Sequence, residues 1–286
     1  MIPSQFEFQA PTTVDEAVGL LANGMDVKVL AGGQSLLPVL KLRMADPEMV
    51  VSLNKVDALR GVRREGEHLV IGAMTTHAEV ATDPLLSAHA GLLSKVAATI
   101  ADPQVRNRGT IGGAVVHADP AGDMGGALLA ADAQMTIAGP SGTRTVAAAD
   151  FFVDFFTTAV DEDELLTEIR VPVFDGWGAD YQKFTRVAQQ WSIVAAGAMV
   201  RTTGDQIAEA RVVLTNMDSV PRRATAVEQA LAGTALTEEA VASACAAAAE
   251  GTNPTDDLNG DANYRRHLAT VLTRRAVLAA AGYRSS

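Results

Sequence analysis

The sequence predicts an α+β protein of two domains, and three observations carry this prediction. In the first half, aliphatic runs typical of strands alternate with segments whose apolar residues recur at helical spacing. In the second half, strand patterns come first and helix patterns follow, which is the order of α+β folds. The chain has 286 residues, more than one ordinary domain of about 100 to 150 residues. The boundary is expected at residues 172–178, where Pro, Asp and Gly cluster.

The first domain, residues 1–175, is expected to have two lobes divided near residue 57. In the first lobe the expected elements are a helix at 13–24, a strand at 27–30, a helix at 35–44 and a strand at 49–53. Each helix begins with a side chain that can accept a backbone N–H: Thr13, in a capping box with Glu16, and Ser35. A strand–helix–strand unit of this length predicts a parallel pair with a right-handed crossover.

In the second lobe, about residues 58–175, the sequence predicts hairpins and helices. Two hairpins are expected to turn at residues 65–66 and 139–142. A second capping box, formed by Thr76 and Glu79, opens a helix. The remaining elements are one continuous helical pattern at 83–100, a glycine-rich loop at 109–123, an alanine-rich helix at 125–133 and a strand at 164–172.

In the second domain, residues 176–286, the sequence predicts a three-stranded antiparallel sheet followed by a three-helix bundle. The strands are expected at 179–187, 192–203 and 210–216, and the helices at 221–233, 237–251 and 263–282. The strands follow one another closely enough to form a meander.

Composition excludes several classes of function. The formal net charge of -11 argues against non-specific binding to nucleic acid or to anionic membranes. The sequence contains no run of about 18 apolar residues that would predict a transmembrane helix. The first eleven residues lack the basic and apolar regions of a secretory signal, so a cytoplasmic location is expected, with contact to the inner face of the membrane only through partners.

The residues that carry metal and nucleophile chemistry form no familiar pattern. Cys245 is the one cysteine, which excludes intrachain disulfides and an iron–sulfur cluster held by four thiolates of this chain. The five histidines show no metal-ligand spacing, and no nucleophile elbow occurs. We therefore predict neither a metal site nor a catalytic residue.

Two glycine pairs are the main candidates for ligand binding. Gly32–Gly33 and Gly112–Gly113 each follow an apolar run and precede a helix. Glycines let a ligand approach backbone N–H groups, and a helix N-terminus favours an anion such as phosphate or pyrophosphate. A tight turn or a close crossing of two backbone segments explains such a pair equally well. Neither loop matches the dinucleotide fingerprint or a Walker loop, so sites of those types are not predicted.

Four segments, in this order, resemble the FAD-binding medium subunit of the molybdenum hydroxylases. They are AGGQSLLPVLKLRM at 31–44, RNRGTIGGAVVHADPAGD at 106–123, LLTEIRVP at 165–172 and YRRHLATVLTRRA at 264–276. The resemblance spans essentially the whole chain and is nearest to the flavoprotein subunit of aerobic carbon monoxide dehydrogenase. It implies a two-lobed FAD-binding domain of the vanillyl-alcohol-oxidase (PCMH) type, followed by a smaller C-terminal domain.

The resemblance also implies non-covalent FAD, with its pyrophosphate between residues 31–35 and 110–114. The cofactor-binding residues that it assigns are Ala31, Gly32, Gly33, Gln34, Ser35, Leu36, Thr110, Ile111, Gly112, Gly113, Ala114, His117, Asp119, Asp123, Leu165, Leu166, Lys183 and Trp191. Two positions depart from the family pattern. Asn is common where this chain has Ala114, and a Tyr that faces the isoalloxazine in the carbon monoxide enzymes aligns with Trp191.

Several of these side chains have a structural explanation as well. Trp191 is expected either to stack on the flavin or to pack in the core or a domain interface. Lys183 either stabilises negative charge on the reduced flavin or is a solvated surface lysine. Leu165 and Leu166 either pack on the cofactor or belong to the core. Arg106 and Arg108, which flank the second glycine pair, are candidates for contact with phosphate or with a partner subunit; a solvated loop is the alternative.

A flavin joins one-electron to two-electron carriers, so the resemblance implies an electron-transfer subunit that acts in a complex. The implied partners are an iron–sulfur small subunit and a molybdenum-cofactor large subunit, in a dimer of heterotrimers. An external acceptor such as a quinone would receive the electrons. Two other functions stay open: a stand-alone flavin oxidase or dehydrogenase of the same fold, and a non-enzymatic nucleotide-binding module. Carbon monoxide, purine, nicotine-type and aldehyde substrates are all compatible with the sequence.

Overall fold

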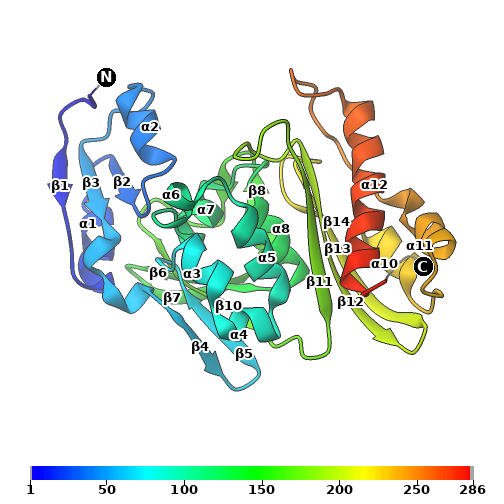
Figure 1. The fold of residues 1–286 in the computed structure, drawn as a ribbon. Helices are drawn as coiled ribbons and strands as arrows, with labels where there is room; N and C mark the ends of the chain where they lie inside the picture. The colour runs from blue at the N-terminus through cyan, green and yellow to red at the C-terminus, as the bar shows by residue number, and fades with distance from the viewer. Residues whose placement is uncertain (1, 284–286) are drawn as a thin grey trace.

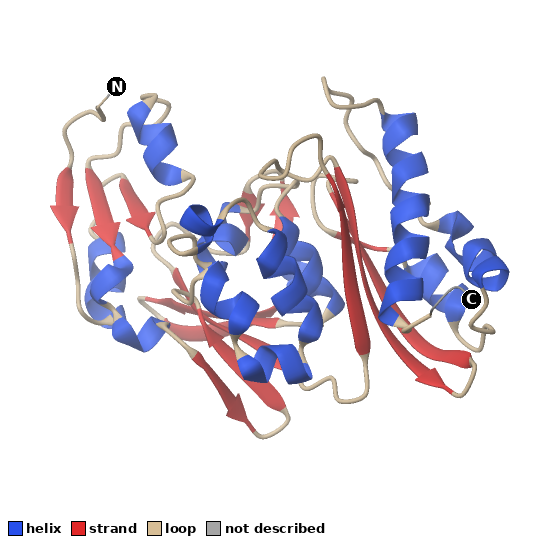
Figure 2. Ribbon diagram, viewed as in Figure 1, coloured by secondary structure: helices blue, strands red, loops and turns tan. Residues whose placement is uncertain are grey.

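The computed structural model describes residues 2–283, which form three parts that lie side by side (Figure 1). A small N-terminal lobe lies at the left of the view, a second lobe at the centre and the C-terminal part at the right. Helices and strands mix in every part (Figure 2). The described chain contains a three-stranded, a five-stranded and a four-stranded sheet and one two-stranded ribbon.

The N-terminal lobe contains the parallel strands that the sequence predicts. Its sheet has the order β1-β3-β2, and both pairings are parallel. The elements are β1 (Glu7–Gln9), α1 (Val14–Leu21), β2 (Val27–Leu30), α2 (Leu36–Lys41), β3 (Met49–Ser52), and the 3-10 turns η1 (Leu53–Lys55) and η2 (Asp57–Leu59). Thr13 and Glu16 form the predicted capping box. The capping role predicted for Ser35 is wrong, because its backbone is already helical and its side chain makes no capping hydrogen bond.

The second lobe is built on a five-stranded antiparallel sheet of order β4-β5-β10-β6-β7. Its strands are β4 (Val62–Glu65), β5 (His68–Gly72), β6 (Gln134–Gly139), β7 (Gly142–Ala147) and β10 (Leu165–Pro172), and the ribbon consists of β8 (Phe152–Asp154) and β9 (Thr157–Thr158). Both predicted hairpins are confirmed, as β4–β5 and β6–β7. The ribbon was not expected from the sequence, since its strands are only three and two residues long.

The helices of this lobe differ from the predicted ones in several places. They are α3 (His77–Thr82), α4 (Pro84–His89), α5 (Gly91–Thr99), α6 (Pro103–Arg106), α7 (Ile111–His117), α8 (Asp123–Ala130) and α9 (Ala148–Phe151). The single helix expected over residues 83–100 is wrong, because Ala90 leaves the helical region and the carbonyl of His89 accepts the N–H of Phe174. The expected loop at 109–123 contains α7, which Thr110 caps.

The C-terminal part forms the predicted meander with one strand more. The strands are β11 (Gly178–Phe184), β12 (Val194–Thr203), β13 (Gln206–Thr215) and β14 (Arg222–Arg223), all antiparallel. The helices are α10 (Thr225–Leu231), α11 (Glu238–Ala244) and α12 (Ala262–Ala280), with the 3-10 turn η3 (Cys245–Ala247). The sheet is therefore four-stranded rather than three-stranded. β14 is two residues long, too short to give a strand pattern in the sequence.

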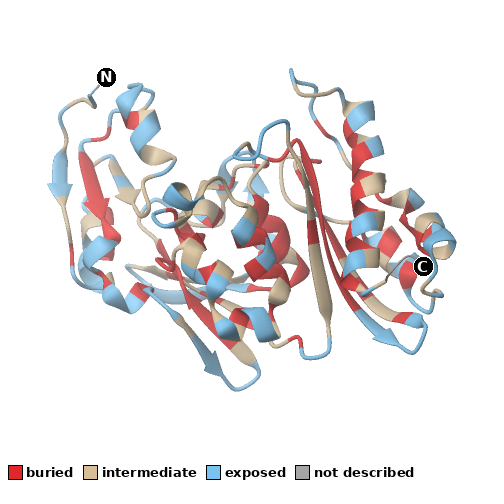
Figure 3. Ribbon diagram, in the orientation of Figure 1, coloured by how far each residue is buried: buried red, intermediate tan, exposed pale blue. Residues whose placement is uncertain are grey.

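The four-stranded sheet is covered on both faces. α10 and α12 pack on one face, and α5 and α8 of the second lobe pack on the other. Neighbouring residues of β13 face opposite sides: Val212 packs with the C-terminal helices and Val213 with the core of the second lobe. The sheet is accordingly buried along its middle (Figure 3). The same apolar cluster thus runs from the second lobe into the C-terminal part and fixes the two against each other.

Among residues 2–283, no helix combines the length and the apolar character that crossing a bilayer requires.

Candidate functional site

A cavity of about 710 Å³ lies between the three parts of the molecule. Its walls come from β2 and α2, from the segment between α6 and α8, and from β11 and the loop that precedes β12. This volume is in the range of pockets that enclose organic ligands. All the residues that the resemblance assigns to FAD line the cavity except Ile111, which is fully buried in the core instead.

The first glycine pair makes a close crossing of two loops. A Cβ on Gly32 would lie 2.2 Å from the carbonyl oxygen of Arg108, and Gly33 has a φ of 76°. The protein's own backbone therefore requires glycine at both positions. This agrees with the explanation of the pair as a tight turn and a close crossing of two backbone segments.

The same loop presents free hydrogen-bond donors to the cavity. Within the described chain, the backbone N–H groups of residues 33–36 donate to no protein acceptor. All four of these residues line the cavity, and the side-chain amide of Gln34 is turned back onto the carbonyl of Gly32 at 3.1 Å. Consecutive N–H groups at the start of a helix form a cradle for an anion. The first loop thus meets the requirement for binding a phosphate group.

The second glycine pair has no such free donors. The N–H groups of Ile111 and Gly112 donate to the carbonyls of Thr75 and Ala73, both at 2.9 Å. Gly113 donates to the hydroxyl of Thr110 at 3.1 Å. A Cβ on Gly112 would lie 2.6 Å from Ala73, so this pair packs α7 against the end of β5. The two loops do meet at one cavity, but the N–H groups of Ile111, Gly112 and Gly113 are all used within the protein.

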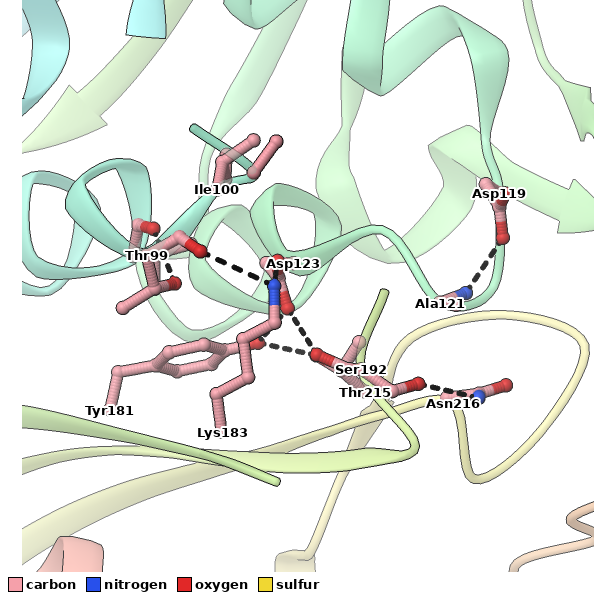
Figure 4. A network of polar contacts seen from close by, with 12 residues as sticks. Thr99, Ile100, Asp119, Ala121, Asp123, Tyr181, Lys183, Ser192, Thr215 and Asn216 are labelled. Atoms are coloured by element: carbon pink, nitrogen blue, oxygen red, sulfur yellow. Dashed lines mark hydrogen bonds and ion pairs between the residues drawn. The ribbon is translucent and has the colours of Figure 1, made fainter. Parts of the chain in front are cut away.

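A buried carboxylate, Asp123, also lines the cavity, and Figure 4 shows its polar contacts. It is the first residue of α8, and its side chain is 3% exposed. The ammonium of Lys183 lies 2.6 Å from its Oδ2, and the hydroxyl of Tyr181 donates to its Oδ1 at 2.7 Å. Burial and the neighbouring carboxylate hold the pKa of Tyr181 well above its ordinary value. Lys183 is only 9% exposed, so it is not a solvated surface lysine.

The apolar and aromatic candidates have different surroundings. Trp191 is 53% exposed and lines the cavity, so it does not belong to the core. Leu165 and Leu166 are buried in two core clusters and also contribute to the cavity wall. The ring of His117 contacts Phe156, with the ring centroids 5.2 Å apart. Arg106 donates to the carbonyls of Ile100 and Ala101 and so braces the loop before α6, which makes it a structural residue of this wall.

Several titratable residues of the cavity wall were missed from the sequence, and His77 is the most buried of them. His77, the first residue of α3, is 3% exposed and lines the cavity, and its Nδ1 has no hydrogen-bond partner in the described chain. Burial and the nearby guanidinium of Arg106 lower the pKa of His77 to about 4. The sequence carries no signal for this position, because a histidine after an N-cap is ordinary on a helix that faces solvent.

Comparisons with known proteins agree along the whole chain. Residues 4–174 match the family model described as FAD binding domain in molybdopterin dehydrogenase, and residues 179–280 match the CO dehydrogenase flavoprotein C-terminal domain. The chain is 43% identical to the carbon monoxide dehydrogenase medium chain of Hydrogenophaga pseudoflava, over 98% of both proteins. It is 40% identical to the medium chain from Afipia carboxidovorans, over 97% of both. A chain in the structure of the Hydrogenophaga pseudoflava enzyme matches with a TM-score of 0.95 at 44% identity, over 99% of both chains.

Acidification is expected to destabilise the chain through His77. The folded pKa is about 4 and the ordinary value is 6.5. Between these values the unfolded chain binds a proton that the folded chain excludes, so the free energy of unfolding falls as pH falls. From pH 7 to 4.5 this contribution amounts to about 2 to 3 kcal/mol. Urea unfolding at both pH values, for the wild type and for His77→Leu, measures it.

For each protein, the free energy of unfolding at one pH is subtracted from that at the other pH. Any effect of the leucine on stability that is the same at both pH values therefore cancels. His77→Leu should lose less stability on acidification than the wild type by this amount. An equal loss in both proteins would contradict the assignment of a buried, neutral His77.

Proposed function

This chain belongs to the family of FAD-binding medium subunits of the molybdenum hydroxylases, and from that membership we propose that it is the electron-transfer subunit of a carbon monoxide dehydrogenase-type complex. The predicted fold, a two-lobed FAD-binding domain with a smaller C-terminal domain, is confirmed. The chain is an FAD-dependent oxidoreductase component, and FAD is its cofactor. We propose residues 1–175 and 176–286 as its two domains, which agrees with family matches that end at 174 and begin at 179.

The observation that supports FAD in this cavity most directly is the row of free amides at residues 33–36. Among the described residues that line the cavity there are two lysines, Lys28 and Lys183, and no arginine, and Lys183 is already paired with Asp123. Backbone N–H groups are therefore the main donors for an anionic pyrophosphate. We propose that the pyrophosphate lies on this loop, with Thr110 and Gly113 of the second loop forming the facing wall.

The ends of the cavity suit the two ring systems of FAD. Leu165, which clusters with Val27 and Val29 of β2, and Leu166 supply an apolar surface suited to the adenine. Trp191 and Lys183 lie at the C-terminal side, suited to the isoalloxazine. The exposed indole of Trp191 is available for stacking on a flat ring. When bound, FAD would accept electrons singly and release them singly or in pairs, while the protein binds and orients it and limits its access to water.

The electrons are proposed to come from another chain. Cys245, the sole cysteine, is fully buried in the C-terminal core. One cysteine cannot supply the four thiolates that hold an iron–sulfur cluster. We therefore propose an iron–sulfur small subunit and a molybdenum-cofactor large subunit as partners, assembled as a dimer of heterotrimers, with a quinone or similar acceptor. Carbon monoxide is the substrate that we propose for the whole complex, since both medium chains compared above are named for carbon monoxide dehydrogenase.

Replacing Ser35 by Ala is expected to weaken FAD binding without affecting folding. The Ser35 hydroxyl lines the cavity but caps no helix in the protein, so it is free to bond the pyrophosphate. Its loss should raise the FAD dissociation constant about tenfold or more, as for a hydrogen bond to a charged group. Fluorescence titration of the FAD-free chain with FAD measures the constant, and urea unfolding without FAD measures stability.

Thr110→Val is the comparison for stability alone, since Thr110 faces the proposed site and its hydroxyl is one that the protein does use, as the N-cap of α7. It should lower the free energy of unfolding by about 1 kcal/mol even without FAD. Unchanged FAD affinity in Ser35→Ala would remove the hydroxyl from the proposed phosphate site.

The purified chain is expected to bind FAD but to be nearly inactive alone. With carbon monoxide and a dye acceptor, turnover should appear only when the two partner subunits are added, because the reacting centre lies outside this chain. Steady-state rates with and without partners measure this dependence. Equal rates in both cases would contradict the electron-transfer role, and a chain that stays colourless with added FAD would contradict the flavin site itself.

A further inference from the structure

Four side chains of the C-terminal part form one hydrogen-bonded network with Asp123 of the second lobe (Figure 4). Asp123 Oδ1 accepts from the hydroxyls of Tyr181, at 2.7 Å, and Ser192, at 2.5 Å. Its Oδ2 accepts from the ammonium of Lys183 at 2.6 Å. The outer member is Thr215, whose hydroxyl lies 3.3 Å from that of Tyr181. The network is closed to solvent, with Tyr181, Ser192 and Thr215 all less than one-tenth exposed.

The direction of each hydrogen bond follows from the carboxylate. An ionised carboxylate only accepts, so Tyr181 and Ser192 both direct their single hydroxyl proton at Asp123. Tyr181 then has no proton left for Thr215, and Thr215 must donate to it. Each hydroxyl in the network therefore has one acceptor, and rotation of any of them would leave a buried polar group unpaired.

The network ends at the cavity in two places. Lys183 lies in the cavity wall, and its ammonium makes a second, longer contact of 3.4 Å with the carbonyl of Thr99. Ser192 directly follows Trp191, and residues 189–191 also line the cavity. The backbone of Ser192 is held as well, because its carbonyl accepts from the side chain of Asn216 at 2.8 Å. Trp191 itself is 53% exposed, so its position depends on the anchoring of its neighbour.

Resting on the proposed FAD site, we propose that Tyr181 and Ser192 are positioning residues for the isoalloxazine end of the cavity. Through Asp123 they hold the ammonium of Lys183 in the wall and fix the segment that carries Trp191. Neither residue touches the cavity itself. The charge that Lys183 brings to the site is balanced by Asp123, so the network supplies an oriented donor without an unpaired charge beside the ring.

Single-hydroxyl variants test this role. Tyr181→Phe and Ser192→Ala each remove one donor to Asp123 and keep the rest of the side chain. They are made in the full-length chain with Trp177→Phe, which leaves Trp191 as the one tryptophan. Ser94→Ala is the matched control, because its buried hydroxyl donates to the carbonyl of Val80 and does not line the cavity.

Three measurements report on position rather than on stability. Acrylamide quenching of Trp191 in the FAD-free chain should rise about twofold in both variants, as its segment becomes more mobile. The FAD dissociation constant should rise about tenfold. The visible absorption band of bound FAD should also shift, because its surroundings change. Ser94→Ala should lower thermal stability and leave all three unchanged.

Quenching, affinity and flavin absorption that match the Ser94→Ala control in both variants would overturn the proposal. If Tyr181→Phe does not fold, Ser192→Ala decides alone, since Tyr181 and Lys183 still hold Asp123 in that variant. Failure of this proposal and failure of the proposed function give different experimental results. A chain that binds no FAD contradicts the proposed function, whereas the quenching experiment needs no FAD and still tests the anchoring of Trp191.

Discussion

The buried charge of Asp123 constrains the whole arrangement around the cavity. A carboxylate that is 3% exposed costs several kcal/mol to desolvate unless it is paired and hydrogen-bonded. Asp123 belongs to the second lobe, and all its side-chain partners belong to the C-terminal part. The carboxylate is satisfied only when the two parts are docked. Since β11 and the segment before β12 also line the cavity, docking and completion of the site are one event.

The cavity lining contains more carboxylates than lysines. Six carboxylate side chains reach its lining, namely Asp119, Asp123, Asp154, Asp161, Glu162 and Glu164, against two lysines. A dinucleotide with an anionic pyrophosphate is nevertheless the proposed ligand. The amides of residues 33–36 resolve this conflict, because backbone N–H groups carry partial positive charge with no counter-ion of their own. The N-terminal lobe thus contributes a row of backbone donors to a cavity that is otherwise rich in carboxylates.

The glycine pairs illustrate two uses of one sequence pattern. At Gly32 and Gly112 the absent Cβ makes room for the protein's own backbone, at Arg108 and at Ala73. In the first loop the N–H groups of residues 33–36 stay free, whereas those of Ile111, Gly112 and Gly113 donate to Thr75, Ala73 and Thr110. A ligand cradle and a packing contact are therefore both present, and the difference between them lies in whether the amides of the glycine pair find acceptors within the protein.

The sequence by itself determined the local features, such as the capping boxes at Thr13 and Thr76, the two hairpins and the meander. These depend on neighbouring residues, so pattern and turn chemistry suffice. Resemblance to a known family supplied the cofactor and the site residues. Only the tertiary structure decided the break at Ala90, the pairing of Lys183, the burial of His77 and the roles of Tyr181 and Ser192. Each of these depends on a partner about 60 or more residues away or on burial between lobes, which no local pattern encodes.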